Sequence, residues 1–365
     1  MDDRCFNVDV YRQLILIPNF SIINFPKVLL VLISQYIRPP ALCLVSHERK
    51  CKYHFVSSTW SRHPDDTGSG GWEMLDADDS FFLEHTSSQP SAAVDIHHFP
   101  TIKYQGQLMS LISGAVYKTN LEKRITTRCD ILPLYCISNY WSAAQVGRLW
   151  FIVHSKGGYG GWVYDLDNSN HSNFGLPGLA GRNASFCSKI VYLEEEGLLL
   201  LFTFYSHIGW ILFLYNPSTK VWQVNSDQQG QIKPTSLPHN TMVFYAPVPT
   251  ASLPSKHTGA KLILWFCAET HFSFFDRHTG AHYPLLEVPR TDGVISIHII
   301  GTLVHKLMRN GDIFTLPLQS LFDLWEAFYH SPAQYSIIDC LDRCIWTTHS
   351  LPPSSTGNFC LYISE

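Results

Sequence analysis

The side chains that most often carry out catalysis or bind metals are present in this chain, but they are scattered along it. Its 18 His stand singly except for His97-His98. Neighbouring residues in a strand point to opposite faces of a sheet, so this pair cannot face one metal ion. None of the ten Cys belongs to a Cys-x-x-Cys pair, and we interpret them mostly as small buried apolar residues. The sequence therefore predicts no metal centre and no cofactor.

Three short runs resemble known functional motifs, and each has a simpler structural interpretation. Residues 155–161, SKGGYGG, lack the Gly-Lys-Ser/Thr order that cradles a phosphate, and they favour a tight turn between strands. Residues 194–197, EEEG, lie between two apolar runs and favour a solvated hairpin turn over a catalytic carboxylate pair. The acidic residues between 65 and 79 lack the spacing of an EF-hand. We therefore predict that the protein is not an enzyme.

The composition restricts the partners and the location of the protein. Charged residues make up 15% of the 365 residues, and the formal net charge is −4. No basic surplus exists to neutralise phosphates, which argues against nucleic acid as a partner. No uninterrupted apolar stretch approaches the roughly 20 residues of a membrane-spanning helix. The first residues, MDDR, are acidic, unlike the basic start of a signal peptide. We therefore expect no membrane association and a location in the cytoplasm, the nucleus or both.

The elements that would position any site begin with a hairpin at residues 209–224, GWILFLYNPSTKVWQV. Its apolar run from 210 to 215 is rich in β-formers and predicts a buried strand. Asn216-Pro217-Ser218-Thr219 predicts a turn, because Asn can bond its own backbone and Pro presets φ. A second short strand follows at 221–224, and we expect its Trp222 to pack between neighbouring structural units.

Similar strand pairs recur from about residue 95 onward, and this recurrence predicts the fold. Corresponding aromatic residues stand roughly 40 to 60 residues apart, a spacing typical of propeller blades with several short strands each. They are Tyr117, Tyr164, Tyr215, Phe275 and Phe314. We predict a mainly β protein, a β-propeller of six or seven blades over residues 95–365, with the first four of these aromatics buried. The last apolar run, NFCLYIS, is expected to pair with an early strand and close the ring.

The chain before residue 95 has a different character. Residues 1–24 form an N-terminal segment without a clear pattern, and residues 61–94 are polar and turn-rich, which indicates a linker or a first blade. Between them, residues 26–37 carry apolar side chains on one face of a helix that Pro26 can begin. Arg38-Pro39-Pro40 ends this helix. A second short helical stretch, ALCLVS, is expected directly after Pro40.

The stretch FPKVLLVLISQYIRPPALCLVS resembles an F-box, which reads as Leu-Pro, a Leu-rich helix, a Tyr-Leu pair, a Pro and a Leu-x-x-x-Ser segment. The match is in register, although Cys51-Lys52 and Trp60 come later than in that family. The strand repeats resemble kelch repeats and F-box-associated propellers. Residues 215–219, YNPST, followed by Trp222, are similar to a unit of the latter, and Gly157-Gly158 is similar to the kelch double glycine.

These resemblances imply a substrate-recognition subunit of a cullin-type (SCF) ubiquitin ligase. An F-box-like helical segment over residues 25–60 would bind a Skp-type adaptor and through it the cullin, while the propeller would recruit a protein target. The residues implied in adaptor binding are Pro26, Leu29, Leu30, Ile33, Tyr36, Ile37, Pro39, Leu42 and Val45. Two alternatives stay open: a propeller enzyme or carbohydrate-binding propeller capped by the N-terminal helices, and an interaction scaffold outside ubiquitination.

Overall fold

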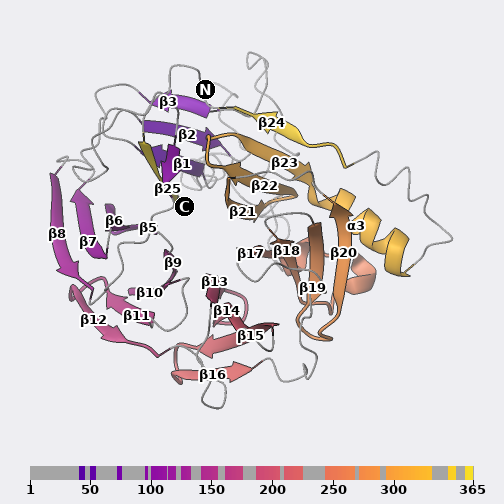
Figure 1. Ribbon diagram of the computed structural model, residues 1–365, viewed down its shortest axis with the longest axis horizontal. Helices are drawn as coiled ribbons and strands as arrows, with labels where there is room; N and C mark the ends of the chain where they lie inside the picture. Colours follow the sequence, from indigo (N-terminus) through magenta and orange to yellow (C-terminus); the bar gives the residue numbers. More distant parts are fainter. Residues whose placement is uncertain are drawn as a thin grey trace, which may run out of the picture.

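The protein is mainly β, and its strands form sheets that radiate from a centre (Figure 1). The computed structural model describes residues 41–45, 50–54, 72–75, 95–97, 100–112, 114–120, 125–132, 141–154, 161–175, 186–205, 209–224, 243–267, 271–287, 293–330, 344–350 and 358–364. None of the helices in these ranges is both long and apolar enough to cross a membrane. Strands far exceed helix, as the sequence predicted, and the architecture is a β-propeller.

Five blades share one pattern, an antiparallel sheet of four strands that follow one another in the chain. Blade 1 contains β5 (Thr101–Tyr104), β6 (Gln107–Ile112), β7 (Ala115–Asn120) and β8 (Ile125–Ile131). Blade 2 contains β9 (Trp141–Val146), β10 (Leu149–His154), β11 (Gly161–Asp165) and β12 (Asn170–Asn173). Blade 3 contains β13 (Phe186–Leu193), β14 (Leu198–Tyr205), β15 (Gly209–Asn216) and β16 (Val221–Val224).

The remaining two blades carry the longest described connections. Blade 4 contains β17 (Val243–Pro247), β18 (Leu262–Cys267), β19 (His271–Asp276) and β20 (His282–Glu287), with the short helices η4 (Thr250–Ser252) and η5 (Ser255–His257) between its first two strands. Blade 5 contains β21 (Val294–Ile300), β22 (Leu303–Met308), β23 (Ile313–Pro317) and β24 (Thr347–His349). Helix α3 (Leu318–Trp325) and the π-helix η6 (Glu326–His330) follow β23.

A sixth sheet, the closing sheet, joins strands from distant parts of the chain. It contains β1 (Ala41–Val45), β2 (Lys50–His54), β3 (Trp72–Leu75), β4 (Asp95–His97) and β25 (Asn358–Ser364), and it lies between blades 1 and 5 (Figure 1). β25 pairs antiparallel with β1 and parallel with β4. The expected pairing of the last apolar run with an early strand is therefore confirmed.

Two expectations need correction. We predicted six or seven blades, and five four-stranded blades are seen, with the five-stranded closing sheet between the first and the last. We also predicted a short helix after Pro40, but Ala41–Val45 is the strand β1. Its whole length pairs with β2 on one side and with β25 on the other, and these ladders satisfy its backbone groups as a helix would. The local pattern of five residues cannot reveal such a distant partner.

The core lies in the seams between blades, where aromatic side chains from neighbouring sheets meet. Tyr164 packs at the seam of blades 1 and 2, Tyr215 at the seam of blades 2 and 3, and Phe275 at the seam of blades 3 and 4. Their exposed fractions are 0%, 6% and 0%, and that of Tyr117 is 9%. The predicted burial of the four recurring aromatics is thus confirmed. Phe314, the fifth, is only half-buried.

The predicted hairpin of residues 209–224 is also confirmed, as β15 and β16. The Asn216 side chain accepts hydrogen bonds from the backbone N–H of Ser218 and of Thr219, at 2.9 and 3.2 Å. Trp222 crosses to blade 2, where its indole N–H donates to the carbonyl of Gly175 at 2.8 Å. Its ring also lies 5.5 Å from that of Phe174, and the side chain is half-buried. Trp222 therefore packs between blades, as expected, but near the edge of the seam.

Candidate functional site: the central cavity

The first strand of each blade borders a central cavity. β5, β9, β13, β17 and β21 are each the end member of their sheet, and Figure 1 shows them nearest the middle of the ring. They line a cavity of about 710 Å³ that is open to solvent. This volume lies within the range of clefts that bind small molecules, roughly 300–1,000 Å³. The cavity is therefore the candidate site that the propeller itself builds.

Its wall exposes polar and apolar surface in nearly equal parts. The apolar part comes from the inward strands of all five blades and includes Ile102, Ala144, Ile190, Tyr245 and Ile297. The lining residues that carry a formal charge are Lys103, on β5, and Glu194, which follows β13. Within the part of the chain that the structure describes, neither side chain forms a hydrogen bond or an ion pair. Both charges are thus available to a bound molecule.

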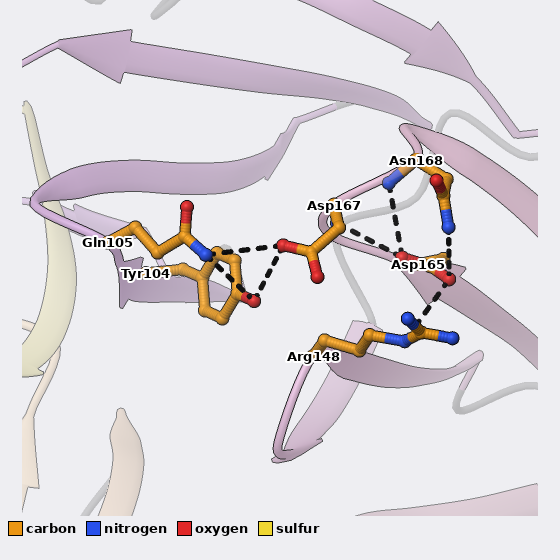
Figure 2. A network of polar contacts seen from close by, with 6 residues as sticks. All are labelled: Tyr104, Gln105, Arg148, Asp165, Asp167 and Asn168. Carbon is orange, nitrogen blue, oxygen red and sulfur yellow. Dashed lines mark hydrogen bonds and ion pairs between the residues drawn. The ribbon is translucent and has the colours of Figure 1, made fainter.

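A polar network fixes the turn beside Lys103 (Figure 2). The hydroxyl of Tyr104 donates to Asp167 Oδ1 at 2.8 Å, and the amide of Gln105 donates to the same oxygen at 3.3 Å. These contacts join the β5–β6 turn of blade 1 to the β11–β12 turn of blade 2. The hydrogen bond to Asp167 raises the pKa of Tyr104, so the phenol keeps its proton at neutral pH. The turn that follows Lys103 is held in place from the next blade.

The second carboxylate of this blade 2 turn has its own partners. Asp165 accepts from the backbone N–H of Asp167 and of Asn168, at 3.0 and 3.1 Å. Its other oxygen accepts from the Asn168 amide and lies 3.5 Å from Arg148 Nε (Figure 2). The Asn168 side-chain hydrogen bond lowers the pKa of Asp165, and the nearby Arg148 adds to the effect. Arg148 is therefore paired with Asp165, and Lys103 is the cation among the described residues that line the cavity.

The β13–β14 turn of blade 3 is linked to blade 4. Glu196 forms ion pairs with Arg277 and, at 3.4 Å, with Lys261, and Glu195 accepts from the Thr250 hydroxyl. Burial alone would raise the pKa of Glu196, but the hydrogen bond and charge of Arg277 outweigh it, so the pKa is lowered. Residues 194–197 do form a hairpin turn, as predicted, yet two of its three carboxylates bind blade 4 rather than solvent.

Two buried polar groups stand in the cavity wall. The Ser142 hydroxyl accepts from the backbone N–H of Ile190 at 2.9 Å, which ties β9 to β13. Trp150 lies at the wall with 0% of its surface exposed, and its indole N–H finds no acceptor among the described residues. A buried donor without a partner costs about 1–3 kcal/mol. Because this N–H has almost no accessible surface, it belongs to the packed seam of blades 1 and 2 and is not open to the cavity.

A second polar cluster lies away from the cavity, where blade 5 meets the long β17–β18 connection of blade 4. Glu326, in η6, is 3% exposed and accepts hydrogen bonds from Lys256 and His257, each at 2.5 Å. Burial would raise its pKa, but these two donors lower it. The His257 ring also packs 4.5 Å from Trp325. We find no group of three or more ligating side chains here or elsewhere in the described ranges that could hold a metal ion.

The predicted adaptor-binding residues do not meet in a described site. Pro26, Leu29, Leu30, Ile33, Tyr36, Ile37 and Pro39 lie outside the described residues. Leu42 and Val45 belong to β1, where their backbones pair with β2 and β25. The sequence reasoning missed Lys103 and Trp150. Both stand in short strands of the repeating pattern, and only the order of strands within each blade places them at the cavity.

Comparisons with known proteins leave the family open. No family model and no curated protein matches the chain. It is similar to a solved structure from a nidogen/laminin complex, with 9% identity, a TM-score of 0.48, and coverage of 88% of this chain and 98% of that one. TolB from Acinetobacter baumannii shares 10% identity at a TM-score of 0.40, over 76% of this chain and 60% of TolB. The extracellular domain of BT4673 from B. thetaiotaomicron shares 11% sequence identity at a TM-score of 0.42. The match covers 75% of this chain and 31% of that one. The fold assignment therefore rests on the sheets themselves.

Proposed function

We propose that this chain is a non-catalytic binding module whose propeller recruits a protein partner. One observation carries the proposal: the blades are nearly uniform, while their connections differ widely. The β9–β10 connection is two residues, whereas the β17–β18 connection of blade 4 contains η4 and η5 and blade 5 inserts α3 and η6. Variable connections on a rigid scaffold are where binding surfaces usually lie.

The test changes the exposed side chains of one connection while keeping the scaffold. We expect a variant in which the exposed Ala251, Ser255 and Thr258 are each replaced by Glu to fold, since Leu253 stays in the core and Lys256 and His257 still bind Glu326, and to lose partners. Proximity labelling in cells would compare it with the intact chain and with a variant altered at the exposed β15–β16 turn. Partners lost only when the blade 4 connection is replaced would support a binding face there. Identical labelling by all three would contradict it.

A narrower proposal is that the protein is a subunit of a cullin-type ubiquitin ligase in the cytoplasm or nucleus. Its support is the F-box resemblance over residues 25–46, together with a propeller that follows it. Since β1 already uses Leu42 and Val45 in the closing sheet, the segment available to a Skp-type adaptor is mainly the apolar stretch 26–37. An apolar face of this width is usually buried against a partner or a domain.

Co-purification with a Skp-type adaptor tests the narrower proposal. We expect the wild-type chain to retain the adaptor, and the double variant Leu30→Ala with Ile33→Ala to lose it while the propeller stays folded by circular dichroism. Binding energy usually concentrates in a few central apolar residues. If wild-type protein never retains the adaptor, the ubiquitin-ligase proposal fails and the binding-module proposal remains. If the double variant unfolds, the stretch is part of the propeller's support.

A further inference from the structure

We infer that Glu326 of blade 5 is a positioning residue for the blade 4 connection, residues 250–259, so that two blades together build the binding face proposed above. The inference rests on the proposed function, because it concerns how the same connection is held for a protein partner. Its basis is the weak support that the connection gives itself and the buried carboxylate that binds it from the neighbouring blade.

The connection has little backbone support of its own. Four backbone N–H groups in it and at its end donate to carbonyls three residues earlier in the chain, those of Ser252, Leu253, His257 and Ala260. Such short turns have poorer hydrogen-bond geometry than an α-helix. A segment with local hydrogen bonds and few buried side chains opens more easily than the sheets around it. Its conformation therefore depends on contacts with the rest of the molecule.

Contacts with blade 5 include an apolar and a polar anchor. Leu253 is 8% exposed and belongs to the same buried cluster as Phe322 of α3. Glu326 begins the π-helix η6, a rare conformation that is frequent at functional sites. Lys256 Nζ donates to its Oε2 and His257 Nε2 to its Oε1, both at 2.5 Å. Each oxygen of this carboxylate is thus bound by one residue of the connection.

The polar anchor favours the closed connection. A buried charge is costly unless it is paired and hydrogen-bonded, and bonds to a charged group are about twice as strong as neutral ones. Burial alone would raise the pKa of Glu326, but the hydrogen bonds from Lys256 and His257 lower it, so the side chain is charged at neutral pH. Opening the connection would break both bonds and leave the buried carboxylate without these donors.

A connection held in one conformation is a better binding surface. Its exposed side chains, those of Ala251, Ser255 and Thr258, then have a fixed arrangement. The entropy of ordering is lost on folding and not on binding, which strengthens the binding of a partner. Glu326 is 3% exposed and out of reach of a partner. Its replacement should nevertheless weaken binding, because it acts through the connection.

Limited trypsin digestion of the full-length protein tests the contact without any partner. Trypsin takes a basic side chain into its own pocket, so cleavage after Lys256 requires this side chain to leave Glu326. We expect Glu326→Gln to raise the rate of this cleavage, followed by mass spectrometry, at least about tenfold, because the rate follows the population of the open form. His257→Phe keeps a ring beside Trp325 but removes one hydrogen bond, and it should raise the rate by a smaller factor. Cleavage after Lys220, in the exposed β15–β16 turn, is the internal reference.

Glu196→Gln is the matched control. Glu196 also forms ion pairs between neighbouring blades, but with Arg277 and Lys261, which lie outside residues 250–259. This variant should leave cleavage after Lys256 unchanged. Equal rates for the wild type and Glu326→Gln, or an equal rise in Glu196→Gln, would overturn the inference. Should Glu326→Gln fail to fold, an unchanged rate in His257→Phe would overturn it.

Proximity labelling separates this inference from the proposed function. We expect Glu326→Gln to reduce severalfold the labelling of those partners that are lost when Ala251, Ser255 and Thr258 are replaced by Glu. If that triple variant loses partners and Glu326→Gln keeps them despite faster cleavage, the binding face stands and the positioning role of Glu326 is refuted. If neither variant loses partners, the proposed function fails, whereas faster cleavage would still support the hold of Glu326 on the connection.

Discussion

The outer hairpins of blades 2, 3 and 4 are closed by one kind of turn, whereas blade 5 closes its last hairpin through helices. Asp165, Asn216 and Asp276 end the third strands of blades 2 to 4, and each accepts backbone N–H bonds from the turn that follows. In blade 5, α3 and η6 follow β23 instead. The turns of blades 2 to 4 are specified by a few neighbouring residues. The helical connection of blade 5 depends on packing against blade 4.

That packing is extensive and aromatic. Trp325 is 2% exposed, and its ring lies 4.5 Å from His257, 5.6 Å from Tyr283 and 5.9 Å from Phe274. The ion pairs of Glu326 with Lys256 and His257 add polar contacts between the same two blades. We therefore expect mutations in the helical insertion of blade 5 to lower the free energy of unfolding more than mutations in the turns of blades 2 to 4.

The largest effect is expected at Trp325. Replacing it by Ala should lower the free energy of unfolding by about 3–5 kcal/mol, because it opens a cavity among buried rings. The measurement is chemical denaturation, with Ile345→Ala as control, since Ile345 is 71% exposed and its truncation should cost less than about 0.5 kcal/mol. A loss below about 1 kcal/mol at Trp325 would show that blade 5 does not depend on this packing.

Trp222 gives the corresponding test for the locally encoded hairpins. Because it is half-buried, Trp222→Ala should cost about 2–3 kcal/mol, less than a fully buried aromatic. Trp222→Phe keeps most of the ring and removes the hydrogen bond to Gly175, which should cost about 1 kcal/mol. Equal losses for Trp222→Ala and Trp325→Ala would remove the distinction between the two regions.

A buried histidine makes blade 5 sensitive to acid. Burial, together with the charge of His349, lowers the pKa of His305 to about 3. Since the unfolded side chain titrates near 6.5, the unfolded state binds more protons between these values. Stability is therefore lost as pH falls from 6.5 toward 3, by about 2 kcal/mol between pH 7 and pH 5.

Denaturation at a series of pH values compares His305→Gln with the wild type. The variant should lose most of this slope, whatever its stability at neutral pH. His330→Gln is the control, because burial lowers the pKa of His330 as well but the side chain is exposed. A slope unchanged in His305→Gln would mean that acid acts on blade 5 through other groups.

The smallest losses of stability are expected in the turns that follow the third strands of blades 3 and 4. Asp276 is 6% exposed and binds the Lys261 and His278 N–H groups and the Thr279 hydroxyl. Asp276→Ala should cost about 1–2 kcal/mol, since it leaves three partly buried donors without their acceptor. Asn216→Ala, in an exposed turn, should cost about 0.5–1 kcal/mol. If denaturation shows the reverse order, burial does not determine the strength of these turns.

The features that could be predicted from the sequence are those that depend on neighbouring residues. The turn at residues 216–219 and the aromatics that precede Asp165, Asn216 and Asp276 are local signals, so the hairpins and the propeller class were predictable. Leu318, Leu321, Phe322 and Trp325 also have helical spacing, a signal that we overlooked. The strand at Ala41–Val45 was not predictable, because its pairing with β25 is specified more than 300 residues later, a separation about which five residues carry no information.

The candidate site was less predictable than the fold. Lys103 and Glu194 have ordinary local surroundings, and no motif marks them. They become a site because each stands on or directly after the first strand of its blade, and because the sheet order turns that strand toward the centre. Trp150 stands out only when the hydrogen bonds around it are known.

The closing sheet has a consequence for how the protein is made. Ribosomes add about 5–20 residues per second, so a chain of 365 residues takes on the order of 20–70 s. β1 emerges early, yet its partner β25 is synthesised last among the described strands. During that interval one edge of β1 is without its partner, and an unpaired edge can take up strands of other chains. Nascent copies on one messenger should therefore be prone to exchange their first strands, and chaperones that cover strand edges should raise the yield of closed rings.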